Sequence, residues 1–76
     1  MSQIVPMHLL QPGERGSILE IGGETHLVRR LGEMGLHAGM EIRMVQPGHP
    51  CIVAIDHQRL SFRGEDEALV LVEVDR

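Results

Sequence analysis

Apolar and polar residues alternate with two different periods along this chain, and the period changes in the middle of the sequence. From about residue 24 to residue 34, apolar residues recur with the spacing of one face of an α-helix. From 40 to 45, apolar and charged residues alternate one by one, as they do along a strand. The pattern therefore predicts a helix that is followed closely by a strand. The apolar residues of the predicted helix are Leu27, Val28, Leu31 and Met34.

Several glycines lie at and near the end of this predicted helix. Gly35 can adopt the left-handed conformation that ends a helix, and Leu36 can then fold back against the last turn, which is typical of a Schellman ending. Gly39 provides a second flexible position just before the strand. Gly32 costs about 1 kcal/mol relative to alanine inside a helix. We therefore expect another backbone to approach Gly32 closely, or the helix end to fray early.

Further strands are predicted on both sides of this stretch. A first strand at 17–21 precedes the helix, and a proline–glycine turn at 11–14 precedes that strand. A turn cluster at 46–50 follows the central strand, and the last strand covers 68–74.

The segment 51–55 is almost entirely apolar, so its pattern alone does not distinguish a strand from a helix. A hairpin resolves the ambiguity. If Asp56 and His57 form a two-residue turn, position 53 faces position 60 and position 51 faces position 62. One face of this hairpin then belongs to the core, and the other is small or polar. The core face carries Cys51, Val53, Leu60 and Phe62, and the outer face carries Ile52, Ala54, Arg59 and Ser61.

These elements predict a mainly β fold with five short strands and one helix inserted between strands 1 and 2. The 76 residues form a single domain, 1–76. Its core must come from aliphatic residues and Met, since the chain has one Phe and neither Tyr nor Trp. We expect a small, strongly curved barrel, because closure hides the strand edges that a small open sheet exposes.

The composition of the chain argues against several classes of function. The net charge is −4, so a phosphate-backbone binder is a poor interpretation and we expect no nucleic acid partner. One cysteine cannot form an intramolecular disulfide, and a reducing cytoplasm is the simplest location. The N-terminal residues do not resemble a signal segment, and no long apolar run would insert into a membrane. No acid, base and nucleophile converge, so we expect no enzyme activity.

Five histidines raise the question of a metal site. His49 and Cys51 are the best local pair, because two positions apart on a strand they share one face and lie about 7 Å apart. Cys51, however, is predicted to face the core as an inert thiol. Because the ligand set is incomplete, the metal site stays unassigned, with His49 and Cys51 as candidates, and we expect no cofactor.

A partner-binding surface is predicted at the helix end. Arg29, Arg30 and Glu33 form a charged helix face that can contact the rim of a partner. Leu36 and Met40 lie in the glycine-bracketed turn, where a small apolar patch near the surface could receive a partner's loop or helix. Ordinary packing of these two residues is the alternative.

The run 31–42, with the sequence LGEMGLHAGMEI, resembles the "LxxMGLxPGxxI" signature of the FeoA family. The proline–glycine turn, the hairpin and the closing strand extend the resemblance along nearly the whole chain, while Ala38 stands where the family often has proline. The resemblance implies an SH3-like barrel and a non-enzymatic accessory protein of bacterial ferrous iron uptake. It also implies a partner, FeoB, the membrane transporter that bears a cytoplasmic GTPase domain. A related domain occurs at the C-terminus of some iron-dependent repressors.

We therefore expect a cytoplasmic protein that binds and modulates an FeoB-type transporter through protein contacts. The alternative is a metal-responsive interaction or dimerisation module with a transition-metal site. The outward apolar residues Ile52 and Ala54 leave room for a homo-oligomer.

Overall fold

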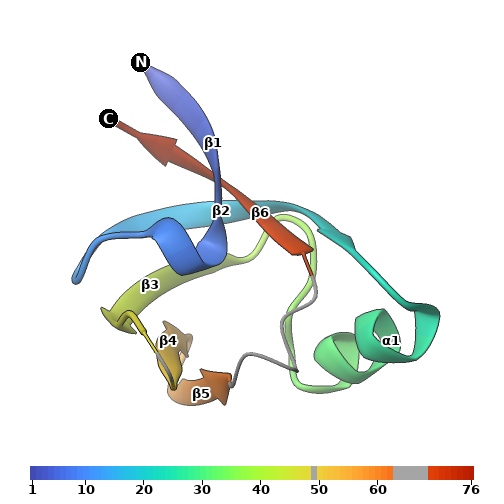
Figure 1. Cartoon of the computed structure of the whole chain (residues 1–76). Coiled ribbons are helices and arrows are strands. Elements are labelled where there is room, and N and C mark those ends of the chain that lie inside the picture. Colours follow the sequence, from blue (N-terminus) through green and yellow to red (C-terminus); the bar gives the residue numbers. More distant parts are fainter. Residues whose placement is uncertain (49, 63–68) are drawn as a thin grey trace.

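The computed structural model describes residues 1–48, 50–62 and 69–76. Its strands form one six-stranded antiparallel sheet in the order β1-β6-β2-β3-β4-β5 (Figure 1). In the described part of the chain, no helix is long and apolar enough to cross a membrane. The elements are β1 (Ser2–Pro6), the 3-10 helix η1 (Met7–Leu9), β2 (Arg15–Gly22), α1 (Thr25–Glu33), β3 (Glu41–Gln46), β4 (Cys51–Ile55), β5 (Gln58–Phe62) and β6 (Leu69–Asp75).

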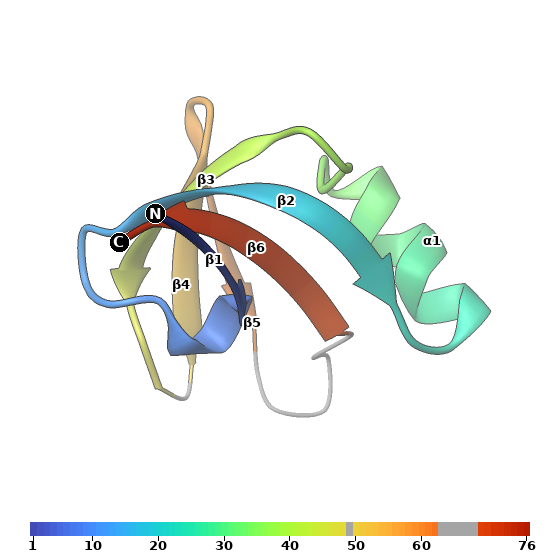
Figure 2. The ribbon, with the colours of Figure 1, turned by 90° about the horizontal axis from the view of Figure 1, so that it is seen from above.

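The sheet is strongly curled. In Figure 1, β1, β6 and β2 lie above β4 and β5, and β3 connects the two groups. Figure 2 shows the same arrangement from above, with α1 beyond the end of β2. The curl encloses the apolar core, so the central strands have one buried face and one outer face.

The prediction of a five-stranded barrel is wrong in two respects. The sheet has a sixth strand, β1, which pairs with β6 along its whole length. The sheet is also open, because among the described residues no ladder joins β1 to β5. Ser2–Pro6 contains two polar residues and a proline, and it becomes an edge strand only because β6, distant in sequence, provides a strand to pair with. The mainly β character and the helix between the first two predicted strands, now β2 and β3, are confirmed.

The predicted hairpin is confirmed in detail. Cys51 pairs with Phe62 and Val53 pairs with Leu60 across β4 and β5. Asp56 has a φ of +52°, as a two-residue hairpin loop of the preferred type requires. Local turn geometry therefore determines which face of this hairpin is buried.

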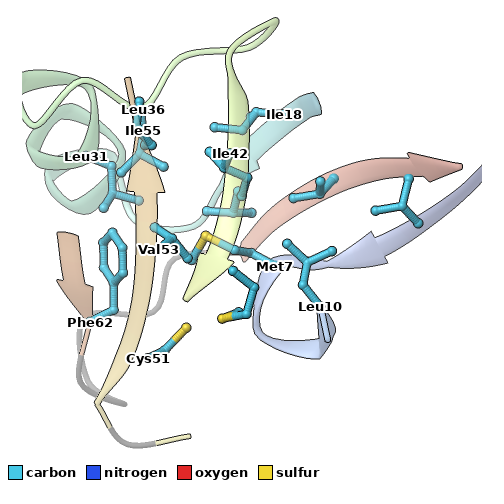
Figure 3. Close-up of a cluster of buried hydrophobic side chains, with 14 residues drawn as sticks. Met7, Leu10, Ile18, Leu31, Leu36, Ile42, Cys51, Val53, Ile55 and Phe62 are labelled. Atoms are coloured by element: carbon cyan, nitrogen blue, oxygen red, sulfur yellow. The ribbon is translucent and has the colours of Figure 1, made fainter. Parts of the chain in front are cut away.

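The core is aliphatic apart from one ring and three sulfur-containing side chains, and Figure 3 shows its members. Cys51 is among its members, so the prediction of a buried thiol is confirmed. The buried apolar residues are Met7, Leu10, Ile18, Leu31, Leu36, Ile42, Met44, Cys51, Val53, Ile55, Phe62, Val70, Val72 and Val74.

The strands β2 and β6 approach each other closely at Gly16. A Cβ atom at this position would overlap Cγ1 of Val72 and would lie 3.0 Å from both the Glu73 carbonyl oxygen and Val74 Cγ1. Gly16 is buried, and β6 is held between β1 and β2. The sheet therefore needs glycine at this position for close packing and not for an unusual φ.

The turn before β2 is held by an ion pair with the last residue of the chain. Gly13 has a φ of +82° after Pro12, as in a type II turn. Glu14 accepts two hydrogen bonds of 2.8 Å from the Arg76 guanidinium and a third, of 2.9 Å, from the Gln11 backbone N–H. These hydrogen bonds lower the pKa of the Glu14 carboxyl from 4.5 to about 2, with the Arg76 bonds the larger cause.

Candidate functional site

The predicted partner surface lies on α1 and in the turn that follows it. α1 packs one apolar face against the sheet, with Leu31 buried and Met34 half-buried. Arg29, Arg30 and Glu33 are exposed, as expected for a solvated helix face. All three charged residues of the prediction are therefore accessible to a partner.

α1 ends in the Schellman motif that the sequence predicts. Gly35 has a φ of +103°, and its N–H donates to the Gly32 carbonyl at 3.1 Å. The Leu36 N–H donates to the Leu31 carbonyl at 3.0 Å, which completes the motif. The expected close approach of a backbone to Gly32 is wrong, since an added Cβ would meet only Cε1 of His37, at 3.7 Å.

Two hydrogen bonds tie the following turn to β2. The Gly39 N–H donates to the Ile18 carbonyl at 2.7 Å, and the Ile18 N–H donates to the Met40 carbonyl at 2.8 Å. Gly39 has a φ of +91°, which glycine adopts without strain. The turn is therefore a fixed part of the fold, and Met40 is held half-buried against the core.

The expectation that Leu36 lies near the surface is wrong. Its side chain is 1% exposed, and Figure 3 places it beside Leu31 and Ile55 at one end of the core. The Schellman motif itself is the reason, because the residue after the left-handed glycine folds back on the last helical turn. Leu36 therefore anchors the turn and presents no side chain to a partner.

The structure adds a feature that the sequence did not predict, a cleft between α1 and β5. We call it the α1–β5 cleft. Phe62 and Leu31 are its buried members, and the view in Figure 3 places them near each other. The space among these residues is about 290 Å³ when the part open to solvent is included, so the cleft is a shallow feature of the surface. It is lined by Leu27, Arg30, Leu31, Met34, Ser61 and Phe62.

The cleft joins residues that are far apart in the sequence. Leu27 and Met34 come from the apolar face of α1, whereas Ser61 and Phe62 come from the end of β5. Helical periodicity places Leu27 and Met34 on the apolar face of the helix, but no local pattern in the sequence shows that β5 ends beside α1. Of the predicted surface residues, only Arg30 lines the cleft.

The described residues show no metal centre. Among them, no group of three or more His, Cys, Asp or Glu side chains is arranged to hold an ion. Cys51 is buried in the core, and His49 lies outside the described residues. The His49–Cys51 candidate therefore stays a prediction.

Fold and site together define a small antiparallel β domain whose helix borders a cleft lined mostly by apolar residues. The FeoA domain model of the FeoA family matches residues 5–74, and the chain belongs to this family. No curated protein sequence matches the chain.

Solved structures agree with this assignment. A crystal structure of an iron uptake regulatory protein (FeoA) is 25% identical, with a TM-score of 0.82 over 92% of this chain and 96% of that one. Iron(II) transport protein A from Clostridium thermocellum is 27% identical, with a TM-score of 0.82 over 92% of this chain and 45% of that one. A manganese-dependent transcriptional repressor shares the fold alone, at 14% identity and a TM-score of 0.85 over 97% of this chain and 43% of that one.

Proposed function

We propose that this chain is an accessory protein of ferrous iron transport that binds the cytoplasmic part of an FeoB-type transporter and modulates uptake. The observation that carries the proposal is the FeoA family match over residues 5–74, together with a cleft between α1 and β5 that is lined mostly by apolar residues. We also infer that the curled open sheet is a variant of the SH3-like fold expected for this family, and that the chain acts at the cytoplasmic face of the membrane.

The α1–β5 cleft and the exposed face of α1 form one continuous candidate surface. An apolar side chain of the transporter would enter the cleft against Leu27 and Met34, because burial of such a side chain contributes about 1.5–3 kcal/mol. Arg30 belongs both to the cleft and to the charged face, and it would orient an acidic group at the rim. Arg29 and Glu33 would extend this rim, and they would affect the rate of association more than the affinity.

Leu36 has a different role in this proposal from the one the sequence suggested. It would hold the turn at 37–40 in place without touching the transporter, because its side chain is buried. Met40 remains a candidate for direct contact, since it is half-buried at the end of this turn.

The test is co-purification of the chain with a full-length FeoB-type transporter in detergent. Ser61→Arg places a long charged side chain at the rim of the cleft from an exposed strand position, so the fold is expected to persist. We expect this variant to lose at least about tenfold in affinity, the cost of excluding one buried apolar side chain. Gln3→Arg, which adds the same charge to β1 at the other end of the molecule, is the matched control (Figure 1).

The two variants separate the cleft from a general charge effect. Equal affinity of Ser61→Arg and the unmodified chain would exclude the cleft as the contact surface. Arg30→Glu tests the charged rim of the cleft. This variant should associate with the transporter more slowly than the unmodified chain, and the difference in rate should decrease at high salt.

A further inference from the structure

The outer face of the sheet carries a row of arginines. The strand register places Arg15 opposite Arg43, Arg43 opposite Ala54, and Ala54 opposite Arg59. Residues on either side of Arg43 and Ala54 are buried, so these positions project from the outer face. We call Arg15, Arg43 and Arg59 the arginine row. It contains three of the seven basic residues of the chain in one line across β2, β3, β4 and β5.

The fold does not use these charges. Like charges directly opposite each other on an antiparallel pair destabilise the sheet, and Arg15 faces Arg43 in this way. Within the described part of the chain, no ion pair or side-chain hydrogen bond is assigned to any member of the arginine row. An external anionic group would remove the repulsion and satisfy the guanidinium groups.

A hollow lies beside the row. Ala54 lines it, and the space is about 560 Å³ when the part open to solvent is included. Arg15 and Arg43 line one part of it, and two exposed carboxylates, Glu41 and Asp56, line another. The surface therefore presents positive and negative groups next to each other and suits a partner that carries both signs.

The length of the arginine row limits which anionic groups can contact all three arginines. Strands lie about 4.8 Å apart, so Arg15 and Arg43 are one spacing apart and Arg43 and Arg59 two, about 14 Å in all along the curved surface, which is more than one phosphate group can bridge. Glu41 and Asp56 lie beside the row, so nucleic acid, which carries a charge on every nucleotide, would bring phosphates against them, whereas a peptide can place an uncharged side chain there. In an extended peptide, side chains at alternate positions lie about 7 Å apart, so three of them also span about 14 Å.

We propose that the arginine row binds an extended acidic segment of a partner protein. Carboxylates at alternate positions of the segment pair with the guanidinium groups of Arg15, Arg43 and Arg59, in the forked geometry that arginine favours. A neutral or basic side chain of the same segment faces Glu41 and Asp56. The row shares no residue with the α1–β5 cleft, so this proposal is independent of the proposed function.

The test uses a short synthetic peptide of alternating glutamate and glycine, titrated into the isotope-labelled chain and followed by NMR. We expect the side-chain Nε–H signals of Arg15, Arg43 and Arg59 to shift together and to saturate. Each single Arg→Gln variant should weaken binding about twofold to fivefold, the range of exposed ion pairs, and the triple variant about tenfold or more. A peptide with glutamine in place of glutamate should not bind.

Further measurements distinguish an acidic peptide from other ligands of the arginine row. Gln3→Glu makes the same change of net charge on β1 and should leave peptide affinity unchanged, whereas an equal loss would show that the peptide responds only to net charge and would overturn the proposal. Tighter binding of inorganic phosphate or of a single-stranded oligonucleotide would overturn it as well. The proposal would also be overturned if sedimentation showed a dimer that buries the arginine row, or if the peptide shifted none of the three arginine signals.

Discussion

Replacing Gly16 with alanine should destabilise the sheet where β2 and β6 pack most closely. The added Cβ would overlap Cγ1 of Val72 and come within 3.0 Å of the Glu73 carbonyl oxygen. Val72 has no exposed area and β6 is paired on both sides, so neither can move away cheaply. Overpacking of this kind costs about 1–3 kcal/mol, and it exceeds the gain of up to about 1 kcal/mol from a less flexible unfolded chain.

The loss is large for a domain of this size. A change of 1 kcal/mol shifts the melting temperature of a 60–100-residue domain by about 4–8 °C. About 2 kcal/mol of overpacking less about 1 kcal/mol of gain leaves a net loss of about 1 kcal/mol, so we expect Gly16→Ala to melt about 4–8 °C lower, with a matching fall in the urea midpoint. Far-UV circular dichroism is the suitable probe, because the chain has no Trp or Tyr for fluorescence.

Gly32→Ala is the matched control, since it makes the same chemical change where there is space. The new Cβ meets only His37 Cε1, at ordinary contact distance, and alanine is the better helix former by about 1 kcal/mol. This variant should therefore melt higher than the unmodified chain. If Gly16→Ala were as stable as Gly32→Ala, the close packing of β2 on β6 would not control stability, and the reasoning would fail.

Three further predictions follow from the core, the Glu14–Arg76 ion pair and the buried thiol. Leu36→Ala should lower the free energy of unfolding by about 2–5 kcal/mol in urea titrations, because it empties a core position, and a loss below about 1 kcal/mol would contradict that placement. The folded-state pKa of Glu14 is lowered to about 2, so its ion pair with Arg76 stabilises the fold above about pH 4.5 and is lost as the pH falls towards 2. Unfolding midpoints of Glu14→Gln should thus be lower than those of the unmodified chain at pH 7 and should converge near pH 2, whereas a constant difference would refute the linkage. Cys51 should resist a thiol reagent until urea unfolds the chain, and rapid labelling of the native chain would contradict its burial.

The predicted partner surface stays a prediction, but the structure shows which of its residues are exposed. The exposure of Arg29, Arg30 and Glu33 followed from helical periodicity, which the packing of α1 preserved. The placement of Leu36 near the surface is wrong, because a turn bracketed by glycines does not by itself expose its apolar residue. The same glycine sends the chain back over α1 and buries the leucine.

The sequence by itself determined the elements that depend on neighbouring residues. The Schellman ending at Gly35 and the hairpin register set by Asp56 and His57 were both predictable, because short-range hydrogen bonds and one positive φ define each of them. The run 31–42 also sufficed to indicate the FeoA family, to which the chain belongs.

Tertiary structure alone decided the features that join distant segments. The pairing of β1 with β6, the close packing at Gly16, the α1–β5 cleft and the arginine row each depend on which strands lie side by side. Alternation along a strand shows which residues share a face, but it carries no information about the neighbouring strand. The two surfaces that we propose for binding are therefore consequences of strand order and sheet curl.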